Sequence, residues 1–179
     1  MTRHGNRKLG QQTALGETVA ASPEQLDLDV LGDTLSFFVR SLNLAVSRDW
    51  DLRVDDLTPM RGTGRVTAVL LVSRHPGIRP SVLAQAAMKD RSEMGRILDG
   101  LEAAGLLTRR PSSTDSRARA LYLTEAGERM ADEVRRRVRE SRTFFDDLSE
   151  EEYRAVIAPL RSLYWRLVTR PRTAGSDVG

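Results

Sequence analysis

The segment PSVLAQAAMKDRSEMGRILDGLEAAG, residues 80–105, contains the pattern of two short helices separated by a tight turn. Pro80 suits the first turn of a helix, where a missing backbone N–H costs no hydrogen bond. Asp90 is a typical helix cap, and Glu93 lies three positions later, as in a capping box. Gly105 follows the second helix at the position where a left-handed residue usually ends one. The segment therefore predicts a helix-turn-helix unit.

The second of these helices has one apolar face and one polar face. The residues expected to be buried recur at helical spacing and are Met94, Ile97, Leu98 and Leu101. The opposite face carries Arg91, Ser92, Gly95, Arg96 and Asp99.

A two-stranded hairpin with a basic tip is predicted directly after the second helix. Two short, partly alternating stretches, residues 106–110 and 119–123, flank a turn that contains Pro, Ser and Thr. In a winged helix-turn-helix, the second helix enters the major groove of DNA and the hairpin touches flanking backbone or minor groove. This order of elements predicts such a fold. The charged residues in or beside the turn are Arg109, Arg110, Asp115, Arg117 and Arg119.

Longer helical patterns flank this unit on both sides. Residues 22–50 are expected to form one amphipathic helix capped at Ser22, and a shorter helix is expected at about residues 59–73. After the hairpin, Thr124 should cap a helix that reaches about residue 147, and Ser149 should open a last one. The apolar stripes of the terminal helices are too long for one winged unit to cover, so we expect a partner chain. The fold class is mainly α: a winged helix-turn-helix with a two-stranded β-wing and a helical dimerisation region built from N- and C-terminal helices.

Composition argues against several functional classes. The chain has 179 residues, of which 40% are apolar and 30% charged, which fits one globular domain with tails. It contains no cysteine and two histidines, which disfavours disulfides, thiol sensing and zinc or haem sites. The longest apolar run, residues 68–72, is far shorter than the roughly 20 residues of a membrane span. We expect a cytoplasmic protein with no cofactor, no metal, no membrane contact and no catalytic residues.

Short sequence motifs follow one another in a fixed order between about residues 25 and 168. The motifs are Leu57-Thr58-Pro59, His75-Pro76-Gly77-Ile78, Leu83-Ala84, Arg91-Ser92, Arg96-Ile97-Leu98-Asp99, Leu101-Glu102, Gly105-Leu106, Arg109-Arg110-Pro111, Asp115-Ser116-Arg117, Leu121, Leu123-Thr124 and Gly127. In this order they resemble the MarR family of bacterial transcriptional regulators. The resemblance implies a homodimer, joined through its first, fifth and sixth helices, that binds a palindromic operator, usually as a repressor relieved by a small molecule.

The resemblance and the helical patterns together give the expected domain organisation. A single MarR-like domain lies between two flexible tails. Its middle part is the winged-helix lobe, and its two ends supply the dimerisation helices. The expected bounds are 1–21 for the first tail, 22–169 for the domain, 57–123 for the lobe, 22–50 and 124–169 for the dimerisation helices, and 170–179 for the second tail.

Three places depart from the family's pattern. Met88 and Lys89 stand where the family usually has a glycine and an apolar residue, so the turn geometry is expected to differ. Glu93 either completes a capping box or accepts a hydrogen bond from a cytosine amino group. Around residues 61–64 the chain also departs from the pattern, which is expected to delay the start of the helix there.

Ten residues are expected to contact DNA. Arginine pairs bidentately with phosphate and with guanine, and the polar face of the recognition helix carries small residues beside its arginines. Gly95 lowers helix stability by about 1 kcal/mol, and we expect it to permit a close approach to DNA. The ten residues are Ser81, Arg91, Ser92, Gly95, Arg96, Arg109, Arg110, Asp115, Arg117 and Arg119.

The resemblance also implies an effector pocket between the dimerisation helices and the DNA-binding lobe. Arg40 would anchor an anionic ligand, and Trp50 would supply an aromatic wall. Since thiol and metal sensing are disfavoured, we expect an organic effector, such as an aromatic carboxylate or its coenzyme A thioester. The candidate residues are Phe38, Arg40, Asn43, Trp50, Arg61 and His75.

Two other functions remain open. A winged helix can serve DNA architecture or protein contacts without an effector, and operator binding that no small molecule relieves would favour that function. An enzyme, such as a hydrolase, would need a nucleophile with a base or a pair of carboxylates in a cleft. The sequence offers no cysteine, no plausible histidine base and no such pair.

Overall fold

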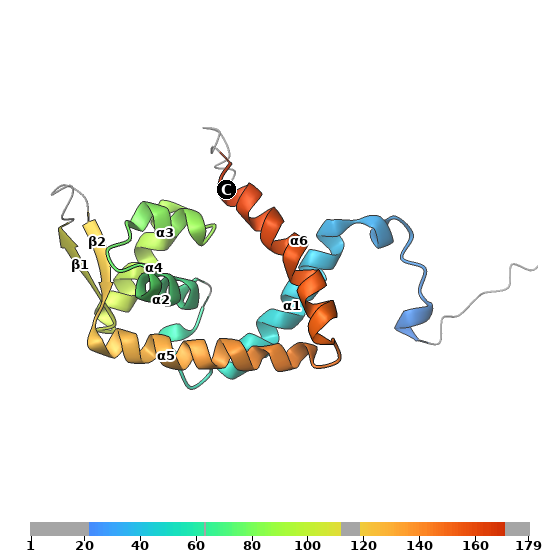
Figure 1. Cartoon of the computed structure of the whole chain (residues 1–179), viewed down its shortest axis with the longest axis horizontal. Helices are drawn as coiled ribbons and strands as arrows, with labels where there is room; N and C mark the ends of the chain where they lie inside the picture. Colours follow the sequence, from blue (N-terminus) through green and yellow to red (C-terminus); the bar gives the residue numbers. More distant parts are fainter. Residues whose placement is uncertain (1–21, 63, 112–118, 171–179) are drawn as a thin grey trace, which may run out of the picture. The chain divides into compact units, whose positions relative to one another are not determined.

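The computed structural model describes residues 22–62, 64–111 and 119–170, which form two units, residues 1–42 and 43–179 (Figure 1). Asp115 and Arg117 lie outside the described residues, and so do the expected tails except for Arg170. The elements are η1 (Pro23–Gln25), η2 (Asp29–Asp33), α1 (Leu35–Arg53), η3 (Thr58–Met60), α2 (Arg65–Arg74), α3 (Pro80–Ala86), α4 (Arg91–Ala103), β1 (Leu107–Pro111), β2 (Arg119–Leu123), α5 (Glu125–Glu140), η4 (Ser141–Phe145) and α6 (Glu150–Val168).

The first helix is shorter than its sequence pattern predicts. Residues 22–34 contain two short 3-10 turns, and α1 begins only at Leu35. Ser22 makes no side-chain cap to the helix. Asp29 has a φ of 48°, and its N–H donates to the Asp27 carboxylate at 2.9 Å. The prediction of one helix from residue 22 is wrong because this local side-chain bond competes with helical hydrogen bonding.

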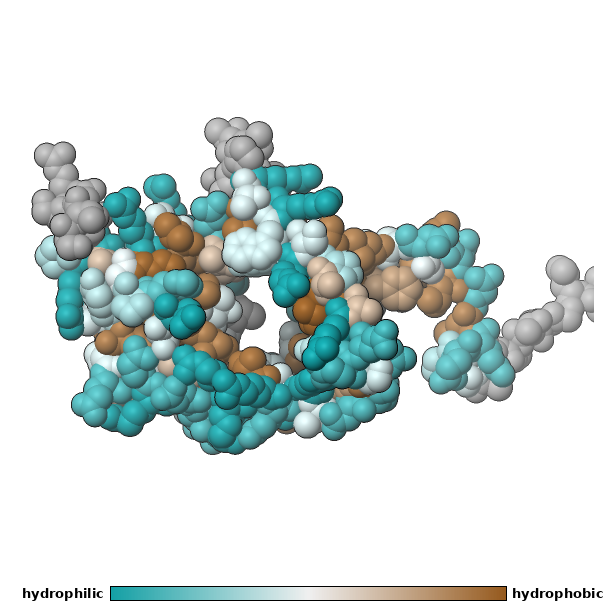
Figure 2. All heavy atoms as spheres, viewed as in Figure 1, coloured by the Kyte–Doolittle hydropathy of each residue, from teal (hydrophilic) through white to brown (hydrophobic). Residues whose placement is uncertain are grey.

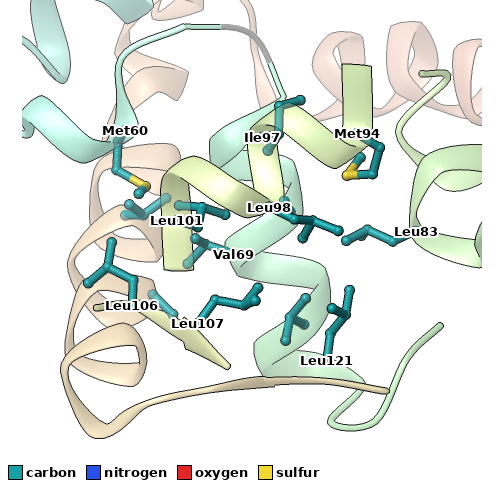
Figure 3. Packing of buried hydrophobic residues seen from close by; sticks show 14 of the residues in the cluster. Met60, Val69, Leu83, Met94, Ile97, Leu98, Leu101, Leu106, Leu107 and Leu121 are labelled. Atoms are coloured by element: carbon teal, nitrogen blue, oxygen red, sulfur yellow. The ribbon is translucent and has the colours of Figure 1, made fainter. Parts of the chain in front are cut away.

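The winged helix-turn-helix fold is confirmed in the second unit. Helices α2, α3 and α4 and the β1–β2 hairpin enclose one apolar core (Figure 3). The strands are antiparallel, with Arg109 opposite Leu121, and an isolated bridge joins Leu121 to Ile78 just before α3. The wing is thereby fixed to the start of the helix-turn-helix. The apolar stripe predicted for α4 is buried in this core: Met94, Ile97, Leu98 and Leu101.

The turn between α3 and α4 is closed by hydrogen bonds of its own backbone and of the cap of α4. The Lys89 N–H donates to the Ala84 carbonyl at 2.9 Å, and the Glu93 N–H donates to the Asp90 carboxylate at 2.7 Å. The Glu93 carboxylate accepts from Lys89 Nζ at 2.5 Å. Met88 has a φ of 54°, in the left-handed region that favours glycine. The departure from the family's glycine therefore leaves a strained residue in the turn.

Replacing Met88 with glycine should raise stability by up to about 1 kcal/mol, because glycine adopts a positive φ without steric cost. The side chain is 57% exposed, so little packing is lost. Ala87→Gly is the matched control. Ala87 has a φ of −82° and packs against the core, so glycine there should destabilise the fold. The free energy of unfolding in urea should rise for Met88→Gly and fall for Ala87→Gly. A destabilised Met88→Gly protein would contradict the claim that Met88 is strained.

The two later helix starts agree with the sequence prediction. The Thr124 hydroxyl accepts from the Gly127 N–H at 3.1 Å at the start of α5. At the start of α6, Ser149 and Glu152 form both halves of a capping box. Helix α5 itself ends at Glu140, earlier than expected, and a 3-10 turn follows it.

The outer face of α5 is hydrophilic and carries interlocked ion pairs (Figure 2). Glu133 accepts hydrogen bonds from Arg136 and Arg137. Arg137 also binds the Asp56 carboxylate and the Arg53 carbonyl, so it ties α5 to the end of α1. The bonds from Arg136 and then Arg137 lower the pKa of Glu133 from 4.5 to about 2.

This lowered pKa gives an expected pH dependence of stability. A carboxylate with a depressed pKa stabilises the fold fully above its unfolded pKa, and that stabilisation is lost as pH falls through the folded pKa. The stability difference between the wild-type protein and Glu133→Gln should be largest at neutral pH and should shrink between pH 4.5 and 2. Urea unfolding at several pH values measures it. Glu151→Gln is the control, since Glu151 makes no ion pair within the described part of the chain. If the stability difference between the wild-type protein and Glu133→Gln did not change with pH, the lowered pKa of Glu133 would not contribute to stability as expected.

Candidate nucleic-acid interface

A basic pocket of about 460 Å³ lies where α3, α4 and the wing meet. Its position follows from the fold, because the hairpin is fixed to the start of α3 by the bridge between Ile78 and Leu121. Five of the ten residues expected to contact DNA line it, and so does Arg79. The lining residues are Arg79, Pro80, Ser81, Arg91, Met94, Gly95, Leu98, Arg109 and Arg119.

Three arginines at this pocket carry uncompensated positive charge. Arg79, Arg91 and Arg119 are exposed, and none of them forms an ion pair within the ranges that the structure describes. The buried side chains of Met94 and Leu98 line the same pocket and belong to the apolar core. Exposed guanidinium groups around a low-dielectric floor concentrate positive potential, which suits phosphate oxygens. This pocket can therefore bind the backbone of a nucleic acid.

Arg109 is already neutralised by α4. Its Nη2 donates to the Asp99 carboxylate at 2.7 Å, and its Nη1 donates to the Glu102 carboxylate at 2.9 Å. Its side chain is 26% exposed. These two charge-assisted bonds hold β1 against α4. Arg109 thus holds the wing against α4. Its contact with DNA stays a prediction.

Arg110 lies on the other face of the same strand. Its guanidinium sits over the Tyr122 ring, 5.0 Å from the ring centroid. Side chains alternate along a strand, so Arg110 does not line the pocket that Arg109 lines. The cation–π contact holds the arginine close to the wing while its charge stays exposed.

The outward face of α4 offers an accessible backbone beside polar groups. Ser92 and Arg96 are exposed, and Arg96 forms no ion pair among the described residues. A Cβ placed on Gly95 would have no atom within 4 Å. The glycine is therefore not required by packing inside the chain, which leaves room for a ligand to approach the helix.

Arg79 was missed by the sequence interpretation. It occupies the N-cap position of α3 with extended backbone, as expected for a residue that precedes proline. Its position immediately before the first helix of the helix-turn-helix is the sequence feature that could have identified it. A cation there lies next to the wing only because Ile78 pairs with Leu121.

None of the six expected ligand-binding residues lines the basic pocket. In the first unit, Phe38 packs edge-on against Phe37 at 5.3 Å, and Arg40 is exposed. In the second unit, Arg61 binds the carbonyl and carboxylate of Asp55, so its charge is compensated. The other three share no side-chain hydrogen bond or ring contact with one another: Asn43 is exposed, Trp50 packs against the core and His75 follows the last turn of α2.

The same described ranges offer no candidate for a metal site or a membrane span. They contain no group of three or more His, Cys, Asp or Glu residues that could hold a metal ion. Their helices include none that is long and apolar enough to cross a membrane.

Comparison with known sequences points to one family. Residues 55–118 match the model of the MarR family. A protein of Thauera aromatica, named as a transcriptional regulatory protein for the hcr operon, is 29% identical over 134 residues. The match covers 73% of this chain and 78% of that protein.

Comparison with solved structures shows the same fold. The repressor CouR, bound to a 23-mer DNA duplex, superposes with a TM-score of 0.68 and 24% identity, over 78% of this chain and 98% of CouR. A MarR family protein of Mycobacterium tuberculosis, in complex with salicylic acid, has a TM-score of 0.58 and 21% identity, over 73% of this chain and 96% of that one.

Proposed function

We propose that the chain is a winged-helix transcriptional regulator of the MarR family and acts as a homodimeric repressor of a palindromic operator. Members of this family are transcriptional regulators and not enzymes. The observation that carries the proposal is the set of exposed, unpaired arginines that α3, α4 and the wing gather at one pocket. Such a surface suits the phosphate backbone on both sides of a helix in the major groove.

The DNA contacts divide by what each residue reaches. Arg96, with Ser92 and Gly95 beside it, faces the base edges from α4. The phosphate backbone of DNA is bound by the pocket's unpaired arginines and by Ser81. Arg109 holds the wing against α4. Arg110 and the wing-tip residues contact the flanking groove. The residues proposed to contact the DNA phosphate backbone are Arg79, Ser81, Arg91 and Arg119. Those proposed to contact the flanking groove are Arg110, Asp115 and Arg117.

The dimer is proposed from the apolar surface of the terminal helices. Val168 is the one buried residue of α6, while its other large aliphatic side chains are about half exposed. An apolar stripe of this length is rarely left in water. We assign residues 22–50 and 124–169 to dimerisation and residues 57–123 to the lobe, within a domain of residues 22–169. The exposed stripe of α6 consists of Val156, Ile157, Leu160, Leu163 and Leu167.

An organic anion is the proposed effector, in the cytoplasm. The M. tuberculosis relative is in complex with salicylic acid, an aromatic carboxylate. Arg40 forms no ion pair among the described residues and is free to anchor such a group, whereas Arg61 is held by Asp55. The proposed lining is Phe38, Arg40, Asn43, Trp50, Arg61 and His75, for an aromatic carboxylate or its coenzyme A thioester.

Selection of bound sequences from a random duplex library tests the operator. We expect an inverted repeat and, in sedimentation at micromolar concentration, a dimer. A folded monomer, or binding without sequence preference, would contradict the proposal. If no small molecule releases the protein from the operator, a winged-helix protein that serves DNA architecture without an effector would be favoured.

The effector should weaken operator binding by about 5- to 150-fold, the usual coupling between two sites. A thermal-shift screen of aromatic acids and acyl thioesters identifies it, since a ligand at 100 times its Kd adds about 2.7 kcal/mol of stability. Arg40→Ala should reduce the response and leave operator affinity without effector unchanged. Collapse of that affinity would show that Arg40 is structural.

A further inference from the structure

Helices α3 and α6 meet at their carboxyl ends through two reciprocal hydrogen bonds (Figure 1). The side-chain Nε2 of Gln85 donates to the Val168 carbonyl at 2.7 Å. The Tyr164 hydroxyl donates to the Ala86 carbonyl at 2.8 Å. Ala86 is the last residue of α3, and Val168 is the last residue of α6. Each helix therefore supplies the donor for the other helix's terminal carbonyl.

These two bonds satisfy groups that have no other partner in the described part of the chain. The last carbonyls of a helix lack intrahelical donors, and neither the Ala86 nor the Val168 carbonyl accepts a backbone hydrogen bond there. Both helix ends also carry partial negative charge, so they repel unless donors stand between them. The contact depends on the amide and the phenol, and the only buried side chain that α6 adds is that of Val168.

The contact lies one short turn away from α4. After Ala86 the chain reaches the cap of α4 at Asp90, and the Lys89 N–H closes the turn on the Ala84 carbonyl. Helices α3 and α4 also pack into the same apolar core, which couples the orientation of one helix to that of the other. The orientation of the end of α3 against α6 thus determines the direction in which α4 presents its polar face.

We propose that Gln85 and Tyr164 are positioning residues that fix the DNA-binding lobe to α6 and so set the half-site spacing that the dimer accepts. This inference rests on the proposed function, because spacing has a meaning only for a homodimer on a palindrome. In such a dimer the two recognition helices must match the two half-sites along the duplex. A lobe held by both bonds presents α4 in one direction, and a lobe released from them samples several.

The test uses substitutions that remove one donor and little else. Tyr164→Phe removes the hydroxyl, and Gln85→Met removes the amide at similar size. Tyr153→Phe is the matched control: it is the same change in the same helix, at a hydroxyl with no hydrogen bond among the described residues. Fluorescence anisotropy gives the affinity for the operator selected by the wild-type protein. The same measurement is made with one base pair added to or removed from its spacer, and with a single half-site.

We expect Tyr164→Phe and Gln85→Met each to reduce the preference for the selected spacing about two- to tenfold. Tyr153→Phe should keep the wild-type preference, and all variants should bind the single half-site equally. Unchanged spacing preference in both variants would overturn the inference, and so would an equal loss of affinity on every duplex. A wild-type protein that selects no inverted repeat would instead contradict the proposed function.

Discussion

Gly127→Ala should destabilise the protein by about 1–3 kcal/mol or more, although alanine normally favours a helix. A Cβ on Gly127 would lie 2.0 Å from the Leu106 carbonyl oxygen and 3.1 Å from Leu123 Cβ. The first of these is a backbone atom, which cannot move without displacing the wing. The first turn of α5 would therefore have to separate from the hairpin.

Gly95→Ala is the matched control on the same fold. No atom lies within 4 Å of the Cβ position there, so the helix propensity of alanine should raise stability by about 1 kcal/mol. For a chain of this size, 1 kcal/mol corresponds to about 2–4 °C in Tm. Thermal unfolding should move in opposite directions for the two variants. A Gly127→Ala protein as stable as the wild type would show that α5 does not pack on the hairpin in this way.

The same control variant has a second readout. If DNA approaches the backbone of α4 at Gly95, the added methyl group should weaken operator binding while the free protein becomes more stable. The two effects separate folding from recognition at a single position.

Replacing Arg79, Arg91 and Arg119 together with alanine should weaken binding to operator and scrambled DNA alike, by a hundredfold or more. Each charge-assisted contact is worth about 1.5–3 kcal/mol. Three phosphate contacts in each half-site should also lower the salt dependence of log K by about five units for a dimer. Anisotropy titrations across a salt series measure both quantities.

Two comparisons make that result specific. Replacing Arg129, Arg154 and Arg161 on α5 and α6 changes the net charge equally and should leave the salt dependence nearly unchanged. Arg96→Ala should cost about 1–3 kcal/mol on the operator alone, because it removes a base contact. An unchanged salt dependence in the first triple variant would show that the basic pocket does not contact DNA.

Local chemistry in the sequence predicted the helix starts and the buried face of the recognition helix. Asp90, Thr124 and Ser149 cap helices where expected, because a cap bonds to N–H groups within the next three residues. The stripe from Met94 to Leu101 is buried because apolar spacing along one helix defines its face. The same reasoning failed before Leu35, where the bond between the Asp29 N–H and the Asp27 carboxylate competes with the helix.

Tertiary structure alone decided which charges are free and which helices touch. Arg79 and Arg109 are both arginines near the wing, yet Asp99 and Glu102 neutralise only Arg109, because β1 packs on α4. The bond from Tyr164 to Ala86 spans 78 residues of sequence. Helical spacing shows which face of an element is apolar, but pairing between elements depends on how their faces pack in three dimensions. The sequence by itself therefore determined the recognition helix and its wing, and packing decided which arginines remain free to bind a phosphate.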